Sequence, residues 1–104
     1  MKGIITKYND YCMFCGRPTT TQHHFLFGRG IRPLAEEDGI KGPACDICHN
    51  MADKVSCRIH DNPMAEKLSK IAGQLAWEKR KVAEGMTEDE AREAFRRRYK
   101  ESWL

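Results

Sequence analysis

The sequence predicts a small α+β domain that is stabilised by a bound metal ion and ends in a helical hairpin. Two Cys-x-x-Cys pairs predict the metal site, because each such turn presents two sulfurs to one ion. Every cysteine and histidine lies between residues 12 and 60, and apolar residues recur at helical spacing beyond residue 62. We therefore expect one domain over residues 1–104, with a metal-binding module at 12–60 and a helical hairpin at 62–104.

The composition favours a cytoplasmic protein without membrane contact. Hydrophobic residues make up 40% of the chain and charged residues 32%, which argues against a disordered or membrane-embedded protein. No apolar run approaches the ~20 residues that span a bilayer, and residues 1–6 are too short for a signal peptide. The five cysteines include two close pairs, which favours thiolate metal ligation in a reducing compartment over disulfides.

The first half of the chain is expected to hold one strand between the two metal-binding turns. Residues 12–17 form the first turn, where Gly16 supplies backbone freedom directly after the second cysteine. The β-prone threonines and the residues that follow them predict a strand over residues 19–27. Gly28–Gly30 ends this strand, and residues 31–42 are expected to form a loop.

Helices are expected in the second half. A helix over residues 46–54 would place the second cysteine pair at its N-terminus, where the helix dipole favours thiolates. Asn62 and Pro63 predict the start of a longer helix that runs to about Ala83. Its apolar residues share one side, which we expect to face the core: Met64, Leu68, Ile71, Ala72, Leu75 and Val82.

A second C-terminal helix is expected after Gly85. Thr87 and Glu90 form a capping box, which predicts the first turn of this helix. Its apolar residues again recur at helical spacing: Ala91, Ala94, Phe95, Tyr99 and Trp103. The two helices are therefore expected to form a hairpin that packs on the metal-binding module.

The two cysteine turns predict one structural zinc ion. Zinc prefers four soft or borderline ligands in a tetrahedron, and the paired turns supply them: Cys12, Cys15, Cys45 and Cys48. Two alternatives remain open: the thiols are buried or redox-active without a metal, or Cys57 and His60 compete for the site as a Cys-x-x-His pair. The Cys-x-x-Cys turns rank first because Cys45 and Cys48 flank a tighter turn.

The adjacent histidines His23 and His24 predict a second site. Successive side chains of a strand point to opposite faces, so one histidine can bind a metal ion while the other faces a substrate. His49 follows the last zinc-type cysteine and can approach the same ion from a helix. The alternative is that these histidines are surface residues or only support the zinc site.

This order of residues resembles the HNH endonucleases, or ββα-metal nucleases, in the form with a four-cysteine zinc site. The segments 25–30 and 59–63 resemble small phage or prophage HNH proteins most. The resemblance implies a treble-clef-like ββα-metal core, a DNA substrate and phosphodiester hydrolysis. It also implies one catalytic divalent cation, for which Mg²⁺, Mn²⁺, Ni²⁺ and Zn²⁺ are the candidates.

The resemblance also assigns roles to individual residues. It implies that His23 is a cation ligand, that His24 is the general base and that His49 is the ligand on the helix. The Asn that orients the base in the family has no counterpart in residues 40–44. His60 or Asp53 would complete the cation site, and we favour His60 because it lies in a turn just before a helix.

Basic residues are expected to contact the nucleic acid backbone. Arg29 and Arg32 lie in the glycine-rich segment after the histidine strand, and Arg96, Arg97 and Lys100 lie in the last helix. Each can also be a solvated surface charge. A protein partner that delivers the substrate is left open.

A non-catalytic, zinc-stabilised adaptor that binds nucleic acid or protein is the alternative function. It accounts for the cysteines and gains support from the missing Asn, but it leaves the two adjacent histidines unexplained. An RNA-binding zinc protein is a third candidate. Two metal sites per chain, one of them sensitive to mild chelation, would favour the nuclease.

Overall fold

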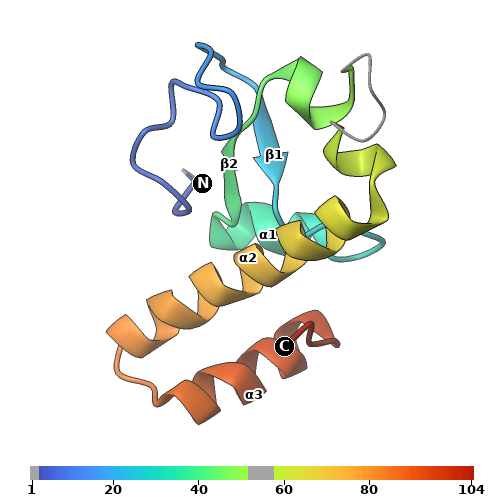
Figure 1. Cartoon of the computed structure of the whole chain (residues 1–104). Coiled ribbons are helices and arrows are strands. Elements are labelled where there is room, and N and C mark those ends of the chain that lie inside the picture. Colours follow the sequence, from blue (N-terminus) through green and yellow to red (C-terminus); the bar gives the residue numbers. More distant parts are fainter. Residues whose placement is uncertain (1–2, 52–57) are drawn as a thin grey trace.

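The adjacent histidines His23 and His24 lie on one strand of a short antiparallel sheet (Figure 1). The structure is a computed structural model that describes residues 3–51 and 58–104. Strand β1 (Gln22–His24) pairs with β2 (Lys41–Pro43), with His23 opposite Gly42 and His24 opposite Lys41. The protein is thus a small α+β structure in which helices surround a two-stranded sheet.

Helices form between and after the two strands. Helix α1 (Arg32–Asp38) precedes β2, the π-helical turn η1 (Ile47–Met51) follows it, and η3 (Ile59–Asp61) is a short 3₁₀ helix. The long helices α2 (Pro63–Ala83) and α3 (Glu88–Tyr99) complete the described elements. Figure 1 shows α2 between α3 on one side and the sheet with α1 on the other.

The prediction for residues 19–42 is partly wrong. The strand is limited to three residues, because Phe25 and Leu26 leave the sheet to become buried in the core. The expected loop contains α1 and β2 instead. Pro33 is compatible with this helix because it lies in the first turn, where no backbone donor is needed. Gly39 ends the helix at φ 73°, a left-handed conformation typical of a C-cap.

The predicted starts of both C-terminal helices and the end of the first are confirmed, but α3 ends at Tyr99, so Trp103 lies beyond the helix in which it was expected. The Asn62 side chain accepts hydrogen bonds from the backbone N–H groups of Met64 and Ala65, at 3.0 and 3.2 Å. Thr87 and Glu90 form both bonds of the capping box at the start of α3. The predicted core side of α3 is also correct, since Ala91, Phe95 and Tyr99 are buried. Local capping chemistry fixes these helix ends.

The prediction for the buried face of α2 is wrong. Leu68, Leu75 and Val82 are 58%, 50% and 40% exposed. The opposite face is buried instead, and it consists of small and polar residues with one tryptophan: Ser69, Gly73, Gln74, Trp77 and Glu78. Small residues let the helix backbone approach the core closely, and hydrophobic periodicity alone does not reveal such a face.

Gly73 marks the point where α2 approaches the core most tightly. A Cβ atom there would lie 2.9 Å from Leu26 Cγ and 3.1 Å from Ile40 Cγ2. We expect Gly73→Ala to lower the free energy of unfolding by up to about 2 kcal/mol, because overpacking costs about 1–3 kcal/mol and the gain in helix propensity offsets about 1 kcal/mol of it. Urea denaturation measures this, with Lys67→Ala at an exposed position of α2 as the control. A stabilised Gly73→Ala protein would contradict the close approach.

Helix α1 is joined to the C-terminal helices by one carboxylate. Asp38 accepts hydrogen bonds from Trp77 Nε1 at 3.0 Å and from Tyr99 Oη at 2.6 Å. It also accepts two bonds from the Arg98 guanidinium, at 2.7 and 2.8 Å. Hydrogen bonds to a charged group are stronger than neutral ones. Asp38 therefore fixes the hairpin to the end of α1, beside a core formed by Phe25, Leu26, Ala35, Ile40, Trp77, Phe95 and Tyr99.

Candidate metal centres

The first cysteine turn is held by its own backbone. Cys12 N–H donates to the Arg17 carbonyl at 2.7 Å, and Gly16 N–H donates to the Cys12 carbonyl at 3.0 Å. Gly16 adopts φ 79°, which glycine reaches without the steric penalty of other residues. The Cys12 sulfur also accepts the Phe14 backbone N–H at 3.4 Å. This turn thereby directs the sulfurs of Cys12 and Cys15 to the same side.

The second turn brings two more sulfurs to the same place. Met13 N–H donates to the Pro43 carbonyl at 3.0 Å, which links the first turn to the end of β2. The sulfurs of Cys15 and Cys45 are 3.5 Å apart, and the four predicted sulfurs all lie within 4.8 Å of one another. A tetrahedral zinc ion with ~2.3 Å bonds separates its sulfur ligands by roughly 3.8 Å. The four-cysteine cluster is therefore compatible with a structural metal such as zinc.

The thiols of this cluster influence each other's ionisation. Burial raises the pKa of Cys12, but backbone hydrogen bonds at Cys45, Phe14 and Cys15 outweigh it and lower that pKa to about 6. Burial and then hydrogen bonds with the neighbouring thiols raise the pKa of Cys48. The cluster thus favours a thiolate at Cys12 and a thiol at Cys48. A bound metal ion would offset the repulsion between neighbouring thiolates and so favour ionisation of the remaining thiols.

Three histidines from different elements form a second cluster. His23 comes from β1, His49 from η1 and His60 from η3, and one ring nitrogen of each lies within 4.8 Å of the others. The ring centroids are 4.6–5.2 Å apart. Nε2 of His49 and Nε2 of His60 are separated by 2.8 Å. A cation with ~2.1 Å bonds to imidazole nitrogens would need them roughly 3.4 Å apart.

Hydrogen bonds outside the cluster orient two of these rings. The Ser69 hydroxyl donates to the Phe25 carbonyl at 3.0 Å, so its oxygen accepts from His23 Nε2–H at 2.8 Å. The other nitrogen of His23, Nδ1, is then unprotonated, and it is buried without a hydrogen-bond partner among the described residues. His60 Nδ1 lies 3.3 Å from Glu66 Oε2, an arrangement typical of a metal-binding histidine.

The environment keeps His23 neutral at physiological pH. Its side chain is fully buried, and this burial, followed by the proximity of His49 and His60, lowers its pKa to about 3. Burial and the proximity of His60 also lower the pKa of His49. Metal ligation requires the neutral imidazole. Burial therefore favours the neutral form of His23 and His49 that metal ligation requires.

His24 points to the other side of β1. Its Nε2 lies 3.2 Å from Glu36 Oε1, and its side chain is only 10% exposed. His24 is near enough to the cluster for its charge to contribute to the lowered pKa of both His23 and His49. It therefore lies beside the three-histidine cluster without belonging to it.

The predicted nucleic-acid contacts come from two separate segments. Arg29 lies on the exposed turn before α1, and Arg32 is the first residue of that helix. Arg96 and Arg97 are exposed on α3, and Lys100 forms its C-cap at φ 65°. The Arg96 guanidinium is already bonded to Glu93, with its shortest contact at 2.6 Å. Arg96 is therefore the least available of these cations.

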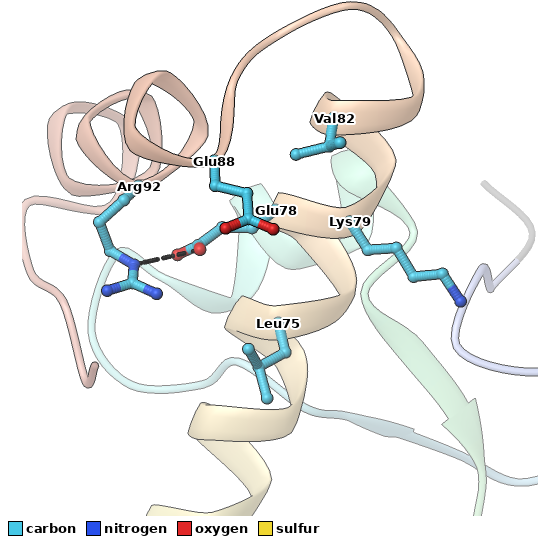
Figure 2. Close-up of a pocket in the computed structure, with 6 residues that line it drawn as sticks. All are labelled: Leu75, Glu78, Lys79, Val82, Glu88 and Arg92. Carbon is cyan, nitrogen blue, oxygen red and sulfur yellow. Dashed lines mark hydrogen bonds and ion pairs between the residues drawn. The ribbon is translucent and has the colours of Figure 1, made fainter.

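A further pocket lies between α2 and α3. Leu75 and Val82, from the exposed face of α2, line it. The Arg92 guanidinium points to the Glu78 carboxylate at 2.9 Å (Figure 2). Glu88 also reaches toward this carboxylate from the start of α3 (Figure 2). None of the pocket's lining residues belongs to the cysteine or histidine clusters. The pocket is thus a helix–helix junction, separate from the candidate metal centres.

Sequence reasoning missed the residues that support the histidines. Glu36, Glu66 and Ser69 were not predicted, although Glu66 lies in the first turn of a helix that begins three residues after His60. The alternative ligands Asp53 and Cys57 lie outside the described residues. Acidic residues on helices are common, so sequence alone gave no signal that distinguished Glu36 and Glu66.

Comparisons with known proteins leave the family of this chain open. No protein family model, curated protein or solved structure matches it. Within residues 3–51 and 58–104, no helix has the length and apolar character needed to cross a membrane. The geometry of the two clusters is therefore the guide to function.

Proposed function

We propose that this chain is a metal-dependent endonuclease of the HNH type that hydrolyses phosphodiester bonds in DNA. The observation that carries the proposal is that His23 clusters with His49 and His60 and that its buried Nδ1 has no hydrogen-bond partner in the described part of the chain. A buried nitrogen lone pair without a partner is unfavourable unless a ligand such as a cation occupies it.

The order of elements supports a treble-clef-like ββα-metal core. Two antiparallel strands, with α1 inserted between them, are followed by the helical turn η1, and the second cysteine pair lies at the junction. Cys48 and His49 are adjacent in sequence but belong to different clusters. A zinc ion on the cysteines would thus hold the segment that presents His49. This arrangement supports the proposal that the zinc site is structural and the histidine site catalytic.

The chemistry follows from the residues around the histidine cluster. A divalent cation held by His23, His49 and His60 would stabilise the negative charge that develops on the phosphate and the leaving oxygen. Ser69 and Glu66 hold two of these rings so that a nitrogen lone pair is free. His24 takes a proton from the attacking water, whose oxygen forms the new bond to phosphorus as the bond to the leaving oxygen breaks.

The exposed cations suit a nucleic acid substrate. Arg29 and Arg32 lie on the surface at the start of α1, the helix that also carries the partner of His24. Arg97 and Lys100 add positive charge on α3. Contacts from such side chains to backbone phosphates position a duplex without reading its sequence. We therefore propose DNA phosphate as the group that these residues bind.

A nicking assay on supercoiled plasmid tests the proposed function. With zinc-loaded protein, we expect nicked circles in the presence of at least one of Mg²⁺, Mn²⁺, Ni²⁺ or Zn²⁺, and none after chelation. Metal analysis should give two ions per chain, one of them removed by mild chelation. One tightly bound ion, no second equivalent and no nicking with any of the four ions would contradict the nuclease and favour a zinc-stabilised adaptor.

A further inference from the structure

Glu36 bridges two residues that face each other across the sheet. His24 of β1 and Lys41 of β2 are register partners. Glu36, from α1, places Oε1 3.2 Å from His24 Nε2 and Oε2 2.6 Å from Lys41 Nζ. Each carboxylate oxygen thus has a separate partner. The contact with Lys41 holds the carboxylate in place, while the other oxygen faces the imidazole.

The charge of Glu36 determines which nitrogen of His24 carries the hydrogen. The hydrogen bond from Lys41, and then that from His24, lower the pKa of Glu36 to about 2, so the side chain is an ionised acceptor at neutral pH. An ionised carboxylate can only accept, which makes Nε2 of a neutral His24 the donor. The lone pair then resides on Nδ1, and this nitrogen is the one that can take a proton.

We propose that Glu36 is the positioning residue of His24, fixing its ring and its Nε2–H tautomer so that Nδ1 acts as the base. The inference rests on the proposed function, because it assigns the group that orients the general base. Glu36, from α1, would take the role of orienting the base that the resemblance assigns to an Asn in residues 40–44. A carboxylate that holds a histidine tautomer is a general arrangement in hydrolytic sites.

The test compares four variants: Glu36→Ala, Glu36→Gln, Lys41→Met and Glu37→Ala. Glu37 is the matched control, since it neighbours Glu36 on α1 but is exposed and lies 3.7 Å from Arg98 instead. Nicking is measured under single-turnover conditions, with the protein in saturating excess over the plasmid and with saturating divalent ion. DNA affinity and ion affinity are measured alongside. The ¹⁵N spectrum of the ring nitrogens reports the His24 tautomer independently of activity.

We expect Glu36→Ala to lower the single-turnover rate by ~10–100-fold, as is typical for residues that orient a functional histidine, with DNA and ion affinity unchanged. The His24 spectrum should change from the Nε2–H form to a mixture of tautomers. Glu36→Gln keeps an acceptor oxygen, so it should retain the tautomer and part of the rate. Glu37→Ala should retain both the tautomer and most of the rate, whereas Lys41→Met releases the Glu36 carboxylate and should lose part of the rate.

The outcomes separate this inference from the proposed function. If the wild type does not nick DNA with any ion, the endonuclease proposal fails, and the His24 spectrum alone decides whether Glu36 sets the tautomer. An unchanged tautomer in folded Glu36→Ala would overturn the positioning role. If Glu36→Ala does not fold, the rate of Glu36→Gln decides, because a full wild-type rate in Glu36→Gln would overturn the positioning role.

Discussion

Cys45→Ser is expected to abolish tight metal binding at the cysteine cluster and to unfold the N-terminal half of the protein. The apparent binding free energy of structural zinc is about 10–16 kcal/mol in zinc-finger peptides, comparable to the 5–15 kcal/mol stability of a whole domain. The sheet beside the cysteine turns has strands of only three residues, and a two-stranded sheet alone is marginally stable. Helices α2 and α3 should keep part of their helicity, because their caps are local.

Metal analysis and thermal unfolding followed by circular dichroism measure this effect. Cys57→Ser is the matched control, since it also removes one thiol but from outside the proposed zinc site. Residue 57 lies beyond the described residues. The control should keep its metal content, with a stability change on the order of 1 kcal/mol. Loss of the tightly bound ion in Cys57→Ser, with retention in Cys45→Ser, would transfer the site to Cys57 and His60.

His24→Ala and His23→Ala are expected to fail in different ways. His24 lies outside the three-histidine cluster, so its loss should leave ion and DNA affinity intact while nicking falls by ~10²–10⁴-fold, the usual effect of removing a general base. His23 supplies a buried nitrogen to the cluster, so His23→Ala should weaken the chelator-sensitive ion. Excess divalent ion should restore part of its activity.

Side-by-side titration of both variants with divalent ion, followed by nicking assays, decides this division of roles. Circular dichroism must show that His23→Ala is folded, because His23 is fully buried beside Ser69. Equal loss of ion affinity in both variants would contradict the separate roles. Undiminished nicking by His24→Ala would remove His24 as the base.

The sequence predicted the cysteine cluster and the helix caps because both depend on short-range patterns. Two sulfurs separated by two residues need only a tight turn, and Asn62 and Thr87 bond to backbone groups within three residues. The grouping of His23, His49 and His60 was proposed from residue type and resemblance, and the structure describes ring nitrogens of all three within 4.8 Å. Whether this cluster binds a catalytic cation remains a prediction.

The parts that sequence could not predict depend on contacts between distant segments. The stripe of Leu68, Leu75 and Val82 has helical periodicity, but the periodicity does not say which face the rest of the protein covers. Gly73 makes the other face suitable for burial, because the missing side chain leaves room for Leu26. Glu36 likewise gains its role only because α1 folds back beside β1, twelve residues after His24.

The bonds of Asp38 also bear on the order in which the chain is assembled during synthesis. Its partners Trp77, Arg98 and Tyr99 follow it by 39, 60 and 61 residues. A ribosome therefore adds every described ligand of both clusters to the chain before it adds the last two of these donors. The metal-binding half can take up its ions while the Asp38 carboxylate is still hydrated. Docking of α3 is then the last step of maturation, and it waits for long-range contacts.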